Sequence, residues 1–120
     1  MILLHPHKRD RAYADARSDE VMRKTIAFFE AKGKQRLKED DHGAVWYRDF
    51  LDFVANEGIF ATMCTPSGYG ADDARWDVWR ICEFAEILGF YGLPYWYAWQ
   101  VTVLGLGPIW MSENEAVKAK

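Results

Sequence analysis

The histidines and cysteines of this sequence, its most reactive side chains, do not come together at a catalytic spacing. Nucleophilic catalysis needs a Ser, Thr or Cys beside a base, usually His. His5, His7 and His42 lie in the polar first third of the chain. Cys64 and Cys82 lie in or near apolar stretches and form no Cys-x-x-Cys pair, so they predict neither a zinc site nor a disulfide framework. We interpret them as structural thiols of a protein in a reducing, cytoplasmic environment.

The acidic residues also lack a pattern that predicts chemistry. Asp40-Asp41 and Asp72-Asp73 are adjacent pairs at predicted loops or helix starts, where carboxylates cap helices or are solvated. Glu83 and Glu86 have a helical spacing that serves metal binding only with histidines nearby, and none is near them. The sequence therefore predicts no catalytic, metal-binding or cofactor-binding residue within this chain.

Composition describes one globular domain with an uneven charge distribution. The chain has 120 residues, 50% of them hydrophobic, and a net charge of −3. Ten Lys/Arg and six Asp/Glu fall in residues 1–39, against five and twelve in residues 40–120. The basic residues of the first part alternate with acidic ones, which favours a solvated helix face over a nucleic-acid or membrane surface. The apolar start, residues 1–4, is too short for a signal peptide.

Apolar periodicity predicts helices over residues 21–39, 44–57 and 72–89. Ser18 or Asp19 is the expected N-cap of the first helix, and Asp72 or Asp73 that of the third. Residues 1–20 lack a period and are interpreted as an N-terminal extension, with the domain covering residues 21–120. In the third helix one predicted face is apolar (Val78, Ile81, Cys82, Ala85 and Leu88) and another polar (Asp77, Arg80 and Glu83).

A stretch without any charge follows, from Leu88 to Met111. Its length is sufficient for a bilayer span, but its aromatic residues gather near the middle, whereas membrane helices carry Trp and Tyr at their ends. We therefore predict no membrane span. The preferred interpretation is a helix over residues 94–106 that is apolar on every face because other helices surround it. The predicted fold is an all-α antiparallel bundle of about five helices around this central apolar helix.

Two segments with many turn residues resemble the N-terminal helical domain of acyl-CoA dehydrogenases. In residues 56–71, Pro66, Tyr69 and Gly70 match that family's Pro-x-x-Tyr/Phe-Gly-Gly motif. In residues 107–118, a Ser-Glu-x-Glu segment that begins at Ser112 is similar to the Gly-Ser-Glu-Glu-Gln-Lys start of the family's next helix. Ala71 replaces the second Gly of the first motif, Gly58-Ile59 stands for an earlier Gly-Leu, and Met111 replaces the Gly before Ser112. The resemblance covers about residues 21–120.

The resemblance implies a role in flavin-dependent α,β-dehydrogenation of an acyl-CoA thioester, as part of a longer polypeptide. The family's flavin motif and catalytic Glu would lie beyond residue 120, so FAD is expected in the full-length protein and not on this chain alone. Electron-transfer flavoprotein is the implied electron acceptor, and a homo-oligomer the implied assembly. Ser112 and Glu115 predict a capping box for a last helix with no stop signal before Lys120. We therefore expect the chain to be a fragment.

The same resemblance implies an acyl-pocket wall on the helix over residues 94–106. Its wall positions are Trp96, Tyr97, Gln100 and Leu104. The bulk of these side chains favours a short, branched or ring-bearing acyl group. The alternative is that the three large residues are ordinary core residues and Gln100 is a buried, hydrogen-bonded amide.

A different class of function also fits the composition. The six Trp, six Tyr and seven Phe are suited to a non-catalytic helical module that binds a partner protein through exposed aromatic residues. The gene sequence beyond residue 120 distinguishes the two hypotheses, because the flavoenzyme needs several hundred further residues.

Overall fold

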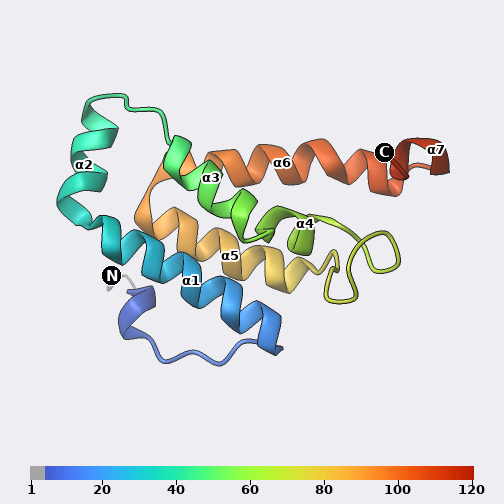
Figure 1. The fold of residues 1–120 in the computed structure, drawn as a ribbon, viewed down its shortest axis with the longest axis horizontal. Helices are drawn as coiled ribbons and strands as arrows, with labels where there is room; N and C mark the ends of the chain where they lie inside the picture. The colour runs from blue at the N-terminus through green and yellow to red at the C-terminus, as the bar shows by residue number, and fades with distance from the viewer. Residues whose placement is uncertain (1–4) are drawn as a thin grey trace.

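The computed structural model describes residues 5–120 and confirms the predicted all-α helical bundle (Figure 1). Within that range it contains no strand. A short 3₁₀ helix, η1 (Pro6–Lys8), precedes α1 (Ala16–Lys32), α2 (Lys34–His42), α3 (Arg48–Asn56), α4 (Ile59–Cys64), α5 (Val78–Tyr91), α6 (Leu93–Met111) and α7 (Glu115–Lys118). The described residues thus form seven α-helices instead of about five, because the first predicted helix is divided in two and α4 forms between the predicted helices over residues 44–57 and 72–89.

A sharp corner divides the first predicted helix. Gly33 has φ +79°, a conformation that favours glycine, and it separates α1 from α2 within residues 21–39. Its N–H still donates to the Phe29 carbonyl, which closes the end of α1. The N-cap of α1 is Asp15, not Ser18 or Asp19, because its carboxylate accepts from the Ser18 N–H at 2.9 Å. The helix therefore begins inside the predicted N-terminal extension.

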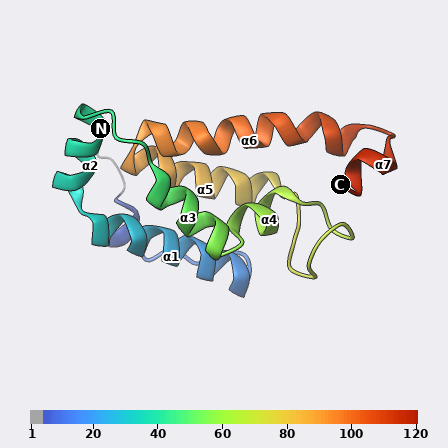
Figure 2. The same cartoon turned by 45° about the horizontal axis from the view of Figure 1, so that its top comes forward.

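Helix α5 lies between α1 and α6 in two views of the molecule (Figures 1 and 2). Phe84 and Leu88 of α5, Phe29 of α1, Phe50 of α3 and Trp99 of α6 are all fully buried in one core. The aromatic rings of this core meet edge-on or stacked, for example Phe84 edge-on against Trp99 with centroids 4.8 Å apart. Aromatic contacts of this kind add to the stabilisation from apolar burial, and they join α1, α3, α5 and α6.

Helix α6 packs on the bundle through one face only. Tyr95, Ala98 and Trp99 are buried, whereas Leu93, Tyr97 and Leu104 are 70%, 57% and 61% exposed. The expectation that this helix is surrounded on every face is wrong, since it lies along one side of the molecule (Figure 2). No helix within residues 5–120 combines the length and apolarity needed to cross a membrane.

The N-caps of α5 and α7 also differ from the prediction. The Arg75 N–H donates to the Thr62 carbonyl at 3.1 Å, which holds the preceding loop against α4. Helix α5 therefore begins later than Asp72 or Asp73 would allow, and Asp77 is its N-cap. The Ser112 hydroxyl donates to the Ile109 carbonyl at 2.8 Å, so Asn114 caps α7 in place of the predicted capping box.

Substitution of Gly33 by alanine tests the corner between α1 and α2. An Ala side chain meets no atom there, so the cost of about 1–3 kcal/mol comes from the positive φ alone. The matched control is Gly105→Ala, which places a Cβ in open space inside α6 and is expected to stabilise by about 0.5–1 kcal/mol. Urea denaturation of both variants checks the opposite signs. Equal stability of the two variants would contradict this account.

Candidate functional site

The structure places the four predicted acyl-pocket residues on two neighbouring parts of the α6 surface. Tyr97 and Leu104 lie on the open face, whereas Trp96 and Gln100 are half-buried at its edge. Trp96 also packs against the core cluster. The alternative interpretation as ordinary core residues therefore fits Trp96 in part and does not fit Tyr97 or Leu104.

Tyr97 and Leu104 belong to a longer apolar stripe. The exposed large side chains of α6 recur every three to four residues along one face and at its end: Leu93, Tyr97, Val101, Leu104 and Met111. We call this set the α6 stripe. At about 1.5 Å of rise per residue it extends over about 27 Å. It carries no charge, so an apolar partner surface can cover it without desolvating an ion.

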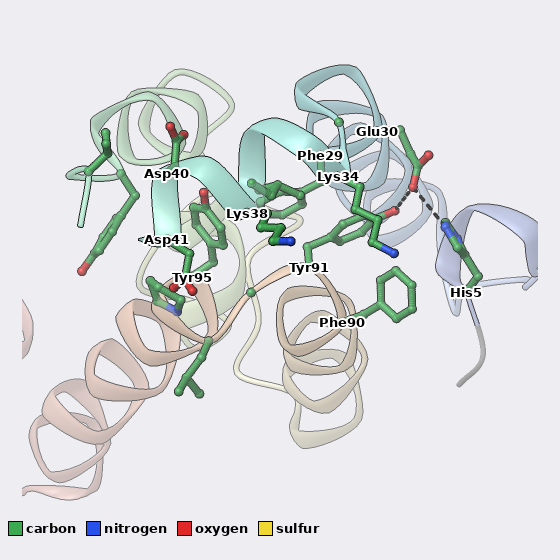
Figure 3. A pocket seen from close by; sticks show the side chains of 17 residues that line it. His5, Phe29, Glu30, Lys34, Lys38, Asp40, Asp41, Phe90, Tyr91 and Tyr95 are labelled. Atoms are coloured by element: carbon green, nitrogen blue, oxygen red, sulfur yellow. Dashed lines mark hydrogen bonds and ion pairs between the residues drawn. The ribbon is translucent and has the colours of Figure 1, made fainter. Parts of the chain in front are cut away.

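A pocket lies at the N-terminal end of α6, between the end of α1, α2 and the start of α6 (Figure 3). Its volume is about 620 Å³. None of the four predicted wall residues lines it, so it is distinct from the predicted acyl site. Nothing in the sequence pattern indicated this pocket, because α2 reaches its position only through the corner at Gly33.

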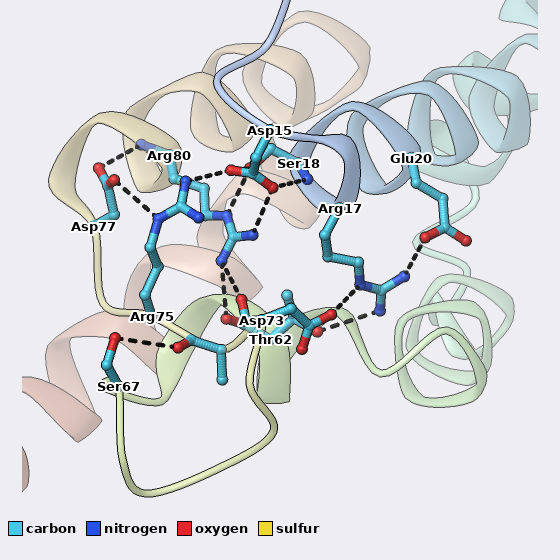
Figure 4. Close-up of polar contacts among 11 residues, drawn as sticks. Asp15, Arg17, Ser18, Glu20, Thr62, Ser67, Asp73, Arg75, Asp77 and Arg80 are labelled. Atoms are coloured by element: carbon cyan, nitrogen blue, oxygen red, sulfur yellow. Dashed lines mark hydrogen bonds and ion pairs between the residues drawn. The ribbon is translucent and has the colours of Figure 1, made fainter.

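Sequence reasoning missed a buried polar cluster where α1, α4 and α5 meet (Figure 4). Arg80 is only 2% exposed. Its guanidinium donates to the Ser18 hydroxyl at 2.8 Å and to the carbonyls of Thr62 and Asp73 at 3.3 and 3.1 Å. Burial lowers the pKa of Arg80, opposed by the charge of Asp15, which lies 3.5 Å away. We call Arg80 and these four partners the Arg80 cluster.

The predicted faces of α5 are therefore only partly right, since Leu88 is buried and Ile81 and Ala85 pack against the core as expected. Arg80 and Glu83 are buried, whereas Val78 is exposed. The signal that could have shown this was the stripe of Phe84, Ile87 and Leu88, because extending it back by one turn reaches Arg80.

Asp15 joins the helix cap to this cluster. Burial opposes its ionisation, but the Ser18 N–H, the Arg75 side chain and the Ser18 hydroxyl all donate to the carboxylate and hold its pKa well below the usual range. Arg17 approaches from the other side of the cluster and donates to the Glu57 carbonyl at 2.7 Å. The cluster has acids and bases in contact with each other, which is typical of a structural ion network.

The remaining reactive groups stay apart. Both cysteines are free; Cys64 is buried, which raises the pKa of its thiol to about 12, and Cys82 is exposed. A thiol with a raised pKa is a poor nucleophile. Within residues 5–120, no group of three His, Cys, Asp or Glu side chains is arranged to hold a metal ion.

The fold and the site define a class of protein in structural terms: an all-α bundle whose last long helix exposes an apolar stripe. No family model, curated protein or solved structure matches the chain.

Replacement of Arg80 tests whether the Arg80 cluster holds the bundle together. Arg80→Met keeps much of the apolar stem. It leaves the Asp73 carbonyl without a donor, takes one of two donors from the Thr62 carbonyl and leaves Asp15 without a cation in the buried cluster, at an expected cost of about 3 kcal/mol in the free energy of unfolding. Arg48→Met is the matched control, because Arg48 pairs with Asp52 in solvent and its loss should leave stability nearly unchanged. The midpoints of urea unfolding compare the two variants. Similar midpoints would show that the buried cluster is dispensable.

The lowered pKa of Asp15 predicts a dependence of stability on pH. A carboxyl with a depressed folded-state pKa contributes stability above its unfolded pKa of about 3.9, and this contribution is lost as the pH falls through the folded value. Asp15→Asn keeps a helix-capping side chain but not the charge, so it should be less stable than the wild type at pH 7 by about 1 kcal/mol. This difference should shrink in acid. Asp72→Asn, at an exposed loop position, should show no such trend in denaturation at several pH values.

Proposed function

We propose that this chain is the N-terminal helical lobe of a flavin-dependent acyl-CoA dehydrogenase, in which α6 contributes a wall of the acyl pocket and a packing surface for further domains. The observation that carries the proposal is the uncovered α6 stripe. It includes two of the four residues that the family resemblance assigns to the pocket wall, Tyr97 and Leu104.

An exposed apolar stripe of this length supports an interface. Soluble monomers rarely leave large contiguous apolar patches open to water, and such patches mark interaction sites or ligand grooves. A second domain placed against α6 would enclose Tyr97 and Leu104 on the side opposite the core. Gln100, half-buried at the edge, would supply a polar group beside the acyl chain. Among residues 5–120 its amide has no side-chain hydrogen bond that would fix it elsewhere.

The chemistry of this proposal belongs to the complete polypeptide. FAD bound there would accept the β hydrogen of the thioester as hydride, and a glutamate of a later domain would take the α proton. The acyl group would thereby be oxidised to the α,β-unsaturated thioester, and electron-transfer flavoprotein would reoxidise the reduced flavin. In this proposal the enzyme is a cytoplasmic homo-oligomer, in keeping with two free cysteines, and this chain alone binds no FAD.

A second candidate function is a helical interaction module. The observation that favours it lies away from α6: Trp46, before α3, and Val78 and Trp79, at the start of α5, are also strongly exposed. Exposed tryptophans are common centres of protein interfaces. In this case the α6 stripe would contact a partner protein and no acyl group.

The test of the first proposal is a change in chain-length preference of the complete protein encoded by the gene. Leu104→Trp adds bulk at a wall position of the proposed acyl pocket. It should lower kcat/KM for long straight-chain acyl-CoA thioesters by about tenfold or more relative to short ones. Val78→Trp is the matched control, because it adds similar bulk at an exposed position on α5 outside the proposed wall.

Several outcomes would overturn the proposal. They are a reading frame that ends near residue 120, a complete protein that binds no FAD, and equal effects of the two tryptophan variants. The first two would favour the interaction module. A stoichiometric yellow complex of FAD with this isolated chain would contradict the placement of the flavin site in later domains. Best turnover of long straight chains by the wild type would exclude the preference for short, branched or ring-bearing acyl groups.

A further inference from the structure

The pocket beside α2 has apolar walls and a size suited to a small molecule. Its volume of about 620 Å³ falls within the range of about 300–1,000 Å³ that is usual for ligand sites. Aromatic and aliphatic side chains from five segments of the chain line it, among them Phe29, Leu37, Tyr47, Phe90, Tyr91 and Tyr95. Such walls can enclose an aliphatic or aromatic group.

Two of the three acidic residues at this pocket are already engaged. Glu30 accepts the Tyr91 hydroxyl at 2.7 Å and lies 3.5 Å from Nε2 of His5 (Figure 3). Asp40 is held at 2.8 Å by both Lys32 and Arg36. Asp40 is therefore neutralised by two cations within the protein. Glu30 is held by a neutral hydroxyl and an imidazole, so it keeps its negative charge.

The two lysines that line the pocket have no ionic partner among the described residues. Lys34 and Lys38 are four residues apart, so their side chains leave the same face of α2. Both extend toward the side of the pocket where Tyr91 lies (Figure 3). In the part of the chain that the structure describes, neither lysine makes an ion pair or a side-chain hydrogen bond, whereas Lys32 of α1 makes two ion pairs. Two ammonium groups are thus available at the mouth of an apolar pocket.

We propose that this pocket binds a small organic carboxylate with an apolar or aromatic body. The carboxylate pairs with the ammonium groups of Lys34 and Lys38, and the body lies against the aromatic walls. Asp41 and Glu30, the two lining carboxylates that no Lys or Arg pairs with among the described residues, limit the charge of the ligand, because they repel a second anionic group. The site therefore selects monocarboxylates over dicarboxylates and over amines of the same shape. This inference does not rest on the proposed function, since the pocket and the α6 stripe share only Leu93.

The first experiment compares two ligands of the same shape and opposite charge. 4-Phenylbutyrate and 4-phenylbutylamine are titrated into the protein, and NMR shifts of its side chains are followed. Saturable binding of the carboxylate that moves the resonances of Leu37 and Tyr91 is expected, with at least about tenfold weaker binding of the amine. Equal binding of the two would overturn the proposal, as would shifts confined to Tyr97 and Leu104, because these report binding to the α6 stripe.

The second experiment removes the proposed cations. The double variant Lys34→Gln, Lys38→Gln should bind 4-phenylbutyrate about tenfold more weakly than the wild type and should lose the preference over the amine. The matched control is Lys8→Gln, Lys120→Gln, which removes the same charge at exposed positions that do not line the pocket. Both double variants should unfold at wild-type urea concentrations, since all four lysines are exposed. Unchanged affinity in the first double variant, or an equal loss in the control, would overturn the assignment of Lys34 and Lys38.

Discussion

The bundle depends on one buried guanidinium. Arg80 of α5 reaches α1 through Ser18, α4 through the Thr62 carbonyl and the following loop through the Asp73 carbonyl. Ser18 on α1 is 62 residues from Arg80 in sequence, and α4 and the loop after it have few regular contacts of their own, because α4 is short and the loop contains no helix. A side chain with five donors in a fixed plane can bond several carbonyls at once, which an apolar residue at this position cannot do. The polar bonds of Arg80 thus link α5 to α1 and α4 beside the aromatic core.

Helix α6 is covered on one face only. Trp99 and Tyr95 bind it firmly to the core, and the Trp110 indole donates to the Cys64 carbonyl at 2.8 Å near its end. Its opposite face has no cover within the described residues. A helix that is apolar all round needs neighbours on every side to be fully buried. Both proposed functions supply that missing neighbour, one as a domain of the same enzyme and the other as a partner protein.

The sequence predicted the class of fold and most helices because apolar periodicity reports which residues must be buried. The sequence was a poorer guide to chain direction and burial at positions whose role depends on residues distant in sequence. In the sequence, Gly33 is a single glycine inside a predicted helix. Its positive φ turns the chain there and brings α2 over the start of α6. Arg80 looks like a surface residue until its partners on α1 and α4 are known. The candidate wall residues on α6 were located by resemblance, and within this chain two of them, Tyr97 and Leu104, are exposed.

The placement of α2 has a consequence for how the molecule opens. Asp40 is the only buried residue of this helix, and its partners Lys32 and Arg36 hold it by charge rather than by apolar packing. Segments with little apolar burial unfold locally at a small fraction of the global free energy, whereas core helices such as α5 open only with the whole domain. Backbone amides of α2 belong to the first group to exchange with solvent. One wall of the pocket thus belongs to a part of the bundle that is less stable than the core helices, and a molecule seated there would be retained by the element that it helps to keep folded.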